Sequence, residues 1–258
     1  MANKIEKQFL DTENKGPVRL NKYLSEAGVC SRREADKLIA AGQVTVDGVR
    51  AETGMKVEPW QVVRIGKKQV SRQEEMIVLV VNKPRGIVCT EERRERDSIV
   101  RFLNYPVRIT YVGRLDKDSE GLLLMTNNGD IINRMMRAAN KHEKEYKVTV
   151  DKPVTDEFLK EMAGGVPILD TVTRPCQVEK LGKYKFKIIL TQGLNRQIRR
   201  MCEALGYEVK ELRRVRIMNI ELGNLKPGEY RKVTDQELNE LYELIRDSKS
   251  EPTPWNNN

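Results

Sequence analysis

The sequence predicts an α+β protein with a small N-terminal domain and a larger C-terminal domain. Its 258 residues correspond to one or two domains of ordinary size. Segments with helical period and segments with strand period follow one another without a regular strand–helix–strand repeat, which argues against a doubly wound fold. A charged stretch from Lys67 to Glu75 precedes a run of apolar residues, and we place the domain boundary there.

The charge balance gives the first indication of a partner. The chain has 47 Lys and Arg against 38 Asp and Glu, a net charge of +9. Such an excess favours a polyanion, either a nucleic acid or an acidic membrane face. No apolar run approaches the roughly 20 residues of a membrane span. The N-terminus carries charges where a signal peptide needs an apolar segment. We therefore expect a soluble, cytoplasmic protein.

Cysteine and histidine limit the possible chemistry. Four cysteines are widely spaced, and His142 is the single histidine. Disulfides are not expected in a reducing compartment, and this set does not make a standard zinc site, so we expect no metal. No G-x-S-x-G motif lies near His142. Any catalysis is therefore expected to use Asp, Glu, Tyr, Lys or Arg.

Two helices are predicted near the start of the chain. Residues 1–16 show no sustained period and are expected to be a flexible tail. Apolar residues then recur on one helix face over 20–27, and Gly28 ends that helix. A capping box at Ser31–Glu34 opens a second helix, which ends at Gly42.

A hairpin and a further strand complete the predicted N-terminal domain. Val44–Val46 and Val49 flank Asp47-Gly48, a dipeptide typical of a two-residue hairpin turn. Residues 62–65 predict another strand. We place this domain at residues 17–75, a length that can just fold alone.

The C-terminal domain is predicted at residues 76–247 and mixes strands with helices. Strands are expected over 77–81, 122–125, 146–150 and 186–190. Helices are expected from Asp130 to about residue 139, over 198–205, and after a second capping box at Thr234–Glu237. Residues 248–258 are expected to be a second flexible tail.

Five basic residues cluster in the N-terminal domain: Arg19, Lys22, Arg32, Arg33 and Lys37. A solvated helix face is the ordinary explanation of such a run. However, Arg32 and Arg33 stand at a helix N-terminus, where the helix dipole disfavours cations. A helix N-terminus with nearby arginines suits a phosphate group. We therefore predict that this cluster binds RNA. The segment VRLNKYLSEAGVCSRREADKLIAAGQVTVDG resembles the S4 domain, a small RNA-binding module, over both helices and the hairpin.

One candidate catalytic residue lies between two predicted strands, in Gly113-Arg-Leu-Asp116. A surface turn capped by Asp118 or Ser119 is the ordinary explanation. However, Arg114 and Lys117 bracket Asp116, and nearby cations favour the ionised carboxylate. An ionised carboxylate on a loop at the edge of a sheet is a candidate nucleophile.

A basic segment further along the chain is the second candidate. Residues 185–216 contain nine basic and three acidic residues, and within them a glycine turn leads into an arginine-rich helix. Such a surface suits phosphates, although a solvated helix face is again the alternative. Arg199 follows buried Ile198 directly and is expected to need an acidic partner. The side chains predicted to hold RNA around the site are Arg114, Lys117, Asn195, Arg196, Gln197 and Arg200. The third candidate, Tyr146, lies on an alternating strand, where an aromatic residue is more often part of the core.

Together these segments resemble the RsuA/RluB/RluE/RluF-type rRNA pseudouridine synthase family, over nearly the whole chain from Val18 to Ile245. The motifs are NKPRG from Asn82, GRLDKDSEGLLLMTNNG from Gly113, KEYKV from Lys144 and GLNRQIRRM from Gly193. The segment from Arg214 to Asn219 is most similar to the RluF branch of this family. Asn128 stands where many members have Asp, outside the catalytic motif, and the C-terminal tail is short.

The resemblance implies an activity and roles for residues. Uridine in RNA becomes pseudouridine without a cofactor, in a catalytic domain built on a mixed, mainly antiparallel sheet with flanking helices. Asp116 corresponds to the catalytic carboxylate, Tyr146 to the active-site tyrosine and Arg199 to the motif arginine that pairs with Asp116. The target base is expected to flip out of its stack. The implied partner is 23S rRNA or a pre-ribosomal large subunit, with tRNA as a further candidate, and a monomer is expected.

Two hypotheses from other functional classes remain open from the sequence alone. A non-catalytic S4-type ribosome-assembly factor fits the basic charge equally well, but it has no need of a carboxylate within a phosphate-binding surface. A carboxylate-pair hydrolase needs two opposed acids across a cleft, and only Asp116 is placed convincingly.

Overall fold

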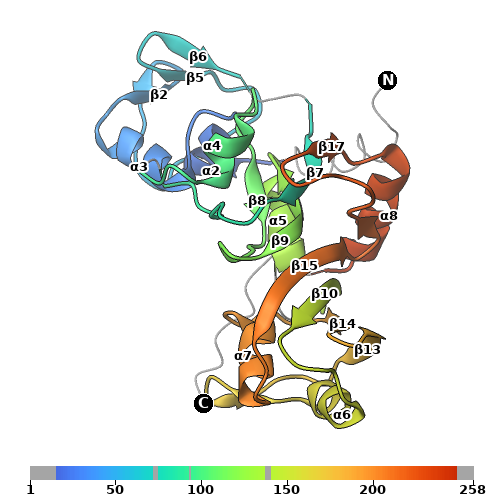
Figure 1. Cartoon of the computed structure of the whole chain (residues 1–258). Helices are drawn as coiled ribbons and strands as arrows, with labels where there is room; N and C mark the ends of the chain where they lie inside the picture. Colours follow the sequence, from blue (N-terminus) through green and yellow to red (C-terminus); the bar gives the residue numbers. More distant parts are fainter. Residues whose placement is uncertain (1–15, 72–74, 93, 137–140, 249–258) are drawn as a thin grey trace. The chain divides into compact units, whose positions relative to one another are not determined.

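The computed structural model describes residues 16–71, 75–92, 94–136 and 141–248. These residues form two compact units, each described here by itself (Figure 1). The first holds the described residues up to Ile77 together with Tyr105–Ile109 and Asn127–Gly129, and the second holds the remainder. The two tails expected from the sequence lie almost entirely outside the described residues. No helix in the described part is long and apolar enough to cross a membrane.

Both helices predicted for the first unit are present, as α2 (Leu20–Glu26) and α3 (Arg32–Ala40). The capping box of α3 is confirmed, because the Glu34 amide donates to Ser31 Oγ at 3.3 Å and the Ser31 amide donates to Glu34 Oε2 at 3.0 Å. These bonds satisfy two amides that the first helical turn leaves without partners.

The first unit also contains a small antiparallel sheet in the order β3-β2-β5-β6. Its strands are β2 (Val44–Val46), β3 (Val49–Arg50), β5 (Val63–Ile65) and β6 (Lys68–Val70), and β1 (Val18–Arg19) pairs separately with β4 (Lys56–Val57). The predicted Asp47-Gly48 turn is confirmed, with φ of 51° and 84°, the positive values that such hairpin turns require. Buried residues of both helices pack with the buried valines of the strands in one core.

A nine-stranded sheet organises the described residues of the second unit (Figure 1). Its main path is β13-β14-β10-β15-β9-β7-β17, with β16 on β15 and β8 on β9. The bounds are β7 (Val78–Lys83), β8 (Thr110–Val112), β9 (Glu120–Thr126), β10 (Lys144–Val150), β13 (Gln177–Gly182), β14 (Lys185–Leu190), β15 (Val209–Ile217), β16 (Ile220–Glu221) and β17 (Tyr230–Lys232). Among the described residues its neighbouring strands run antiparallel, except that β9 and β15 run parallel. The predicted mixed, mainly antiparallel sheet is therefore confirmed.

Helices flank this sheet. They are α4 (Ile99–Leu103), α5 (Gly129–Met136), α6 (Asp156–Gly164), α7 (Gln197–Ala204) and α8 (Asp235–Ile245), and a two-stranded ribbon joins β11 (Pro167–Ile168) to β12 (Thr171–Val172). The capping box of α8 is confirmed, with Thr234 as its N-cap. The elements of this unit that were not predicted from the sequence include α4, α6 and the strands β8, β13, β15, β16 and β17.

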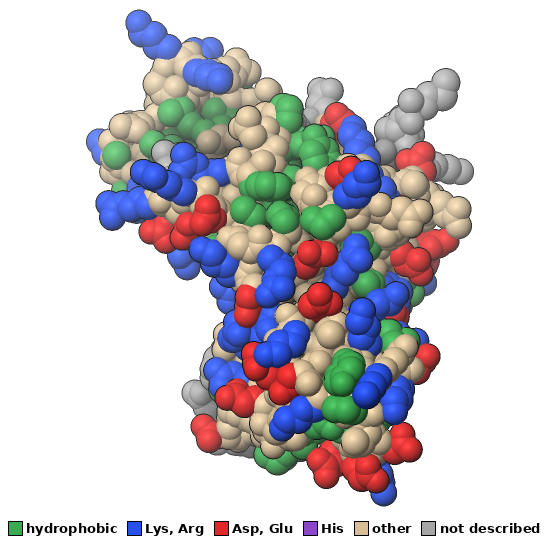
Figure 2. All heavy atoms as spheres, viewed as in Figure 1, with side chains coloured by type: hydrophobic (Ala, Val, Ile, Leu, Met, Phe, Trp, Pro, Cys, Tyr) green, Lys and Arg blue, Asp and Glu red, His purple; other side chains and the backbone are tan. Residues whose placement is uncertain are grey.

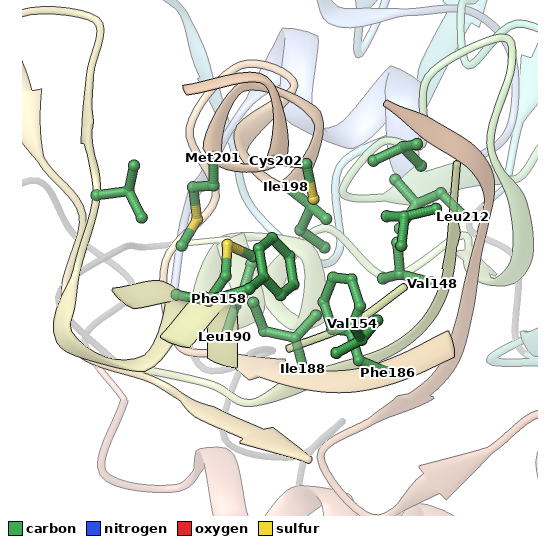
Figure 3. Packing of buried hydrophobic residues seen from close by; sticks show 14 of the residues in the cluster. Val148, Val154, Phe158, Phe186, Ile188, Leu190, Ile198, Met201, Cys202 and Leu212 are labelled. Carbon is green, nitrogen blue, oxygen red and sulfur yellow. The ribbon is translucent and has the colours of Figure 1, made fainter. Parts of the chain in front are cut away.

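The packing of α7 fixes the basic segment against the sheet. Ile198, Met201 and Cys202 are buried and point from this helix into the apolar cluster that contains Ile188 and Leu190 of β14 (Figure 3). The helical spacing read from the sequence is therefore confirmed. Because these apolar residues fix the rotation of α7, the arginines of the same helix leave the core.

Candidate active site

The loop that carries Asp116 connects β8 to β9. Gly113, at its start, has φ of 75°, a left-handed value that glycine adopts without strain. The Ser119 amide donates to the Asp116 carbonyl at 3.1 Å and closes a turn around Asp116, Lys117 and Asp118. The Gly86 amide donates to the Lys117 carbonyl at 2.7 Å. The NKPRG motif therefore lies directly against the Asp116 loop.

Two buried cations hold the backbone of this loop. The ammonium of Lys83, at the end of β7, donates to the carbonyls of Pro84 at 2.8 Å and Ser119 at 2.9 Å. Arg214 of β15 is 2 % exposed, and its Nε donates to the Leu122 carbonyl at 2.7 Å. Burial lowers the pKa of Lys83, and acidic groups nearby, first Cys89 and then the carboxylates, raise it in part. Backbone carbonyls thus accept hydrogen bonds from both positive charges, whose burial would otherwise be costly.

Two carboxylates of this loop lie close to two guanidinium groups from the start of α7. Arg196 donates to both oxygens of Asp118, at 3.2 and 3.1 Å. Nη1 of Arg196 also lies 3.8 Å from Oδ2 of Asp116. Arg199 places its Nε 3.4 Å from Oδ2 of Asp118, and its side chain is only 12 % exposed. This cluster brings together residues of the predicted catalytic loop and of the predicted basic helix.

The expected ion pair between Asp116 and Arg199 is not the one in the structure. Nη2 of Arg199 donates to the Asp118 carbonyl at 3.1 Å and lies 3.4 Å from the Ser119 hydroxyl. Its Nη1 donates to the carbonyl of Val209 at 3.3 Å. These bonds anchor the guanidinium beside residues 118 and 119, so its acidic partner is Asp118. The expectation that partly buried Arg199 needs an acidic partner is confirmed, but in the structure this partner is Asp118 and not Asp116.

Tyr146 lies on β10, opposite Ile188 of β14 and Arg214 of β15. Its side chain is partly buried and packs against the apolar cluster beneath α7. The same strand therefore pairs with β15, whose Arg214 holds the backbone after the Asp116 loop. Tyr146 therefore packs against the core, as the sequence pattern suggested, and is only partly buried.

The other residues predicted to bind RNA near the site differ in the exposure and the contacts of their side chains. Arg114 is exposed, and exposed Lys117 lies 3.4 Å from Asp97. Arg200 is half-buried, and its Nε donates to the carbonyl of exposed Asn195 at 3.1 Å. Gln197 corrects the expectation: it is 4 % exposed, and its Oε1 accepts the Leu194 amide at 3.0 Å. Burial at the start of α7 removes this side chain from the surface, so Gln197 shapes the loop and does not face RNA.

The basic cluster of the first unit lies on and beside α2 and α3. Arg19, Arg32, Arg33 and Lys37 are exposed, whereas Lys22 is half-buried and lies 3.5 Å from Glu26. On the face shown in Figure 2, Lys and Arg side chains gather over the region where Figure 1 draws α3. The exposed members of this cluster remain able to contact phosphates.

Sequence reasoning missed three residues of this site. Asp118 was considered only as a turn cap, Lys83 only as a letter of a motif, and Arg214 only as a mark of a family branch. A signal existed for Lys83, because it ends a strand that begins with four apolar residues, and an unpaired ammonium is not tolerated in a buried strand. Arg214 gave no comparable signal, since charged residues surround it in β15.

Lys144, on the same strand as Tyr146, supports a prediction about pH. Burial, with the charge of Arg214, lowers the pKa of its ammonium to about 8. The unfolded chain then binds the proton more tightly, so this group adds stability as the pH rises from the folded pKa toward the unfolded one. Between about pH 8 and pH 10, we expect the free energy of unfolding of wild type to rise by about 1 to 2 kcal/mol relative to that of Lys144→Met. Urea unfolding at both pH values measures the difference. A constant difference between the two proteins contradicts the prediction.

Comparisons with known proteins identify the family of each part of the chain. A family model described as RNA pseudouridylate synthase matches residues 77–204, and an S4 domain model matches residues 18–73. The dual-specificity RNA pseudouridine synthase RluF of Escherichia coli strain K12 is 54% identical over 239 residues, 92% of this chain and 82% of the relative. An uncharacterized RNA pseudouridine synthase of Mycobacterium tuberculosis strain H37Rv is 36% identical over 242 residues, 88% of this chain and 94% of the relative.

A solved structure supports the same assignment. A crystal structure of a pseudouridylate synthase superposes with a TM-score of 0.64 at 30% sequence identity, covering 87% of this chain and 99% of the other. The fold and the carboxylate–arginine cluster define an RNA-modifying enzyme with an S4 domain. The chain belongs to the RNA pseudouridine synthase family.

Proposed function

We propose that this synthase converts a specific uridine of large-subunit (23S) ribosomal RNA into pseudouridine, with Asp116 as the catalytic carboxylate. The single observation that carries the assignment is the cluster in which Asp116 and two arginines meet on a loop held by buried cations. In the isomerisation the N1–C1′ bond breaks and a C5–C1′ bond forms. C5 loses a proton and N1 gains one, so no oxidant or reductant takes part.

Each residue of the cluster has a role in this proposal. The carboxylate of Asp116 reacts with the nucleotide, and attack at the sugar, attack at the base and removal of a sugar proton all require its ionised form. The guanidinium of Arg199 supplies positive charge beside it and anchors the loop through the Asp118 carbonyl. Tyr146 stacks on the uracil and assists proton removal from C5.

Access to the base follows from its chemistry. A uracil within a stack does not expose C1′ and C5 to a side chain, so the target nucleotide flips out before reaction. Exposed Arg114, Lys117 and Arg196, together with Asn195 and Arg200, then hold backbone phosphates around it. Phosphate contacts position the RNA without reading its sequence.

The two domains divide binding and catalysis in this proposal. Residues 76–247 catalyse the reaction. Residues 17–75 bind the RNA backbone through Arg19, Lys22, Arg32, Arg33 and Lys37. The enzyme acts as a monomer in the cytoplasm, where ribosomal RNA is made and where its free cysteines remain reduced.

Charge reversal of the exposed arginines tests the role of the first unit. We expect Arg32→Glu/Arg33→Glu to raise the RNA concentration for half-maximal single-turnover rate about tenfold or more, with little change at saturation. The salt dependence of binding should weaken by about two ions. The matched control is Lys67→Glu/Lys68→Glu, which reverses two charges at the β5–β6 turn of the same unit. Equal effects of the two double variants would contradict the prediction, because any loss of positive charge in this unit would then weaken RNA binding.

The site of modification is tested in cells. Carbodiimide treatment and primer extension map pseudouridine in rRNA from cells with and without this gene, and from cells complemented with Asp116→Asn. One 23S position should lose its signal without the gene and stay unmodified with the variant. An unchanged 23S map contradicts the proposed substrate.

The Escherichia coli relative is named a dual-specificity RNA pseudouridine synthase, which favours a second RNA substrate for this chain. We propose a tRNA stem-loop, because its unpaired loop exposes a base for flipping at low cost. The same mapping, applied to the tRNA fraction, detects the second site.

A further inference from the structure

An exposed tryptophan stands on the turn between β4 and β5 of the first unit. Trp60 is 78 % exposed, the highest value among the large apolar side chains at the surface of the described residues. Tryptophan usually buries most of its large apolar surface in a folded protein. The apolar core of the first unit forms without it. The packing of this unit therefore does not explain why an indole lies in water at this position.

Hydrogen bonds hold the turn that carries this indole. The Gln61 amide donates to the Glu58 carbonyl at 3.1 Å, and the Glu58 amide donates to Gln61 Oε1 at 2.9 Å. Between them Pro59 takes the position of a tight turn that suits its fixed φ. The carboxylate of Asp47 accepts from Gln61 Nε2 at 2.8 Å and from the Val62 amide at 2.8 Å. Because the turn is already ordered, a ligand that contacts its apex has little backbone entropy to remove.

The two-stranded ribbon that leads into this turn carries two cations opposite each other. Arg19 of β1 and Lys56 of β4 are directly paired across the strands, and both are exposed. Neither side chain forms an ion pair with another residue that the structure describes. Like charges directly opposite each other destabilise a strand pair. A phosphate that binds both side chains would remove this repulsion, so the pair suits the backbone of a nucleic acid.

We propose that Trp60 is a stacking surface for an unpaired base of the RNA, an inference that rests on the proposed action of this chain on RNA. Proteins that bind single strands combine aromatic side chains, on which bases stack, with cations that follow the backbone. Arg19 and Lys56 supply those cations at the ribbon next to the turn. Within a duplex, neighbouring base pairs cover both faces of a base. The contact therefore selects unpaired nucleotides and does not read their sequence.

The two cations favour RNA over a protein as the partner of this surface. An apolar protein surface that covered the indole would also desolvate Arg19 and Lys56 without supplying a negative charge, which is costly. A strand of RNA supplies a π-face and phosphates together.

Fluorescence tests the stacking in the full-length protein. The chain contains two tryptophans, Trp60 and Trp255, so in Trp255→Phe the emission reports on Trp60 alone. A short single-stranded oligouridylate should quench most of this emission at saturation, because a stacked base quenches the indole on contact. An RNA duplex of the same length should leave the emission nearly unchanged.

Binding measurements on variants separate stacking from charge. We expect Trp60→Ala to weaken binding of the oligouridylate about tenfold, as alanine replacement of a stacking aromatic does, and to leave the salt dependence unchanged. Trp60→Phe should keep part of the affinity. Arg19→Gln/Lys56→Gln should instead lower the salt dependence by about two ions. The matched control is Val49→Ala, which truncates another apolar side chain of the same unit, 68 % exposed, and should bind as wild type does.

The outcomes are distinct. Unquenched emission with the oligouridylate overturns the proposal, and so does equal quenching by the duplex or an equal loss of affinity in Trp60→Ala and Val49→Ala. The proposed function is tested separately by the rRNA map. If the map is unchanged while Trp60 is quenched, only the assigned rRNA substrate fails, whereas a lost 23S signal beside an unquenched Trp60 removes only the stacking surface.

Discussion

Replacing Asp116 by Asn is expected to reduce pseudouridine formation at least about a thousandfold, the scale typical of losing a reacting group. The amide has the shape of the carboxylate but carries no negative charge, so it can neither attack carbon nor accept a proton at neutral pH. The fold should survive, because the side chain of Asp116 is one-third exposed and lies 3.8 Å from Arg196, a long distance for an ion pair. RNA affinity should be kept or rise slightly, since a negative charge leaves a basic surface.

Three measurements on one preparation check this expectation. Single-turnover rate gives the chemical step, filter binding gives RNA affinity, and thermal unfolding reports on the fold. Asp97→Asn is the matched control, because it makes the same chemical change at another exposed carboxylate. Full activity of purified Asp116→Asn would falsify the catalytic assignment, and a lost fold would leave Asp116 with a structural role instead.

The second large effect is expected at Gly121, in β9. Its φ is +112°, and a Cβ added there would lie 2.2 Å from the carbonyl oxygen and 2.7 Å from the amide nitrogen of Arg214. Both atoms belong to the backbone of β15, which the parallel pairing of β9 and β15 holds at this point. Neither strand can move away without disturbing the buried bond from Arg214 to Leu122.

We therefore expect Gly121→Ala to lower the free energy of unfolding by about 3–5 kcal/mol, through overpacking together with a disfavoured backbone conformation. Urea unfolding measures the change. Gly182→Ala is the matched control: it also lies in a strand, and a Cβ there meets no atom within 4 Å. Equal stability of the two variants would contradict the close approach of β9 and β15. Because the Asp116 loop leads directly into β9, activity should fall with stability.

The elements that the sequence predicted well depend on residues close together in the chain. The capping box of α3 involves Ser31 and Glu34, and the Asp47-Gly48 turn closes its hairpin within a few residues. The apolar positions of α7 needed only the helical period. Contacts of this kind form wherever the local conformation forms, so a local pattern is enough to predict them.

β15 shows where a local pattern is insufficient. Its residues, VKELRRVRI, are rich in charge, yet they form a strand within the sheet, between β10 and β9. The strand tolerates this composition because fully buried Arg214 finds the carbonyl of Leu122, 92 residues earlier in the chain. No periodicity within β15 contains that information, and this strand was not predicted.

The sequence by itself determined the two-domain α+β organisation, the motif around Asp116 and the partly buried position of Arg199. Only the tertiary structure decided which acid that arginine meets. Asp116 and Asp118 stand on one short turn with similar sequence surroundings, and Arg199 lies 81 residues from Asp118. The choice between them depends on how α7 packs against the sheet and how Lys83 holds the turn. Because the energy of an ion pair and its hydrogen bonds changes steeply with distance, the packed fold selects the partner.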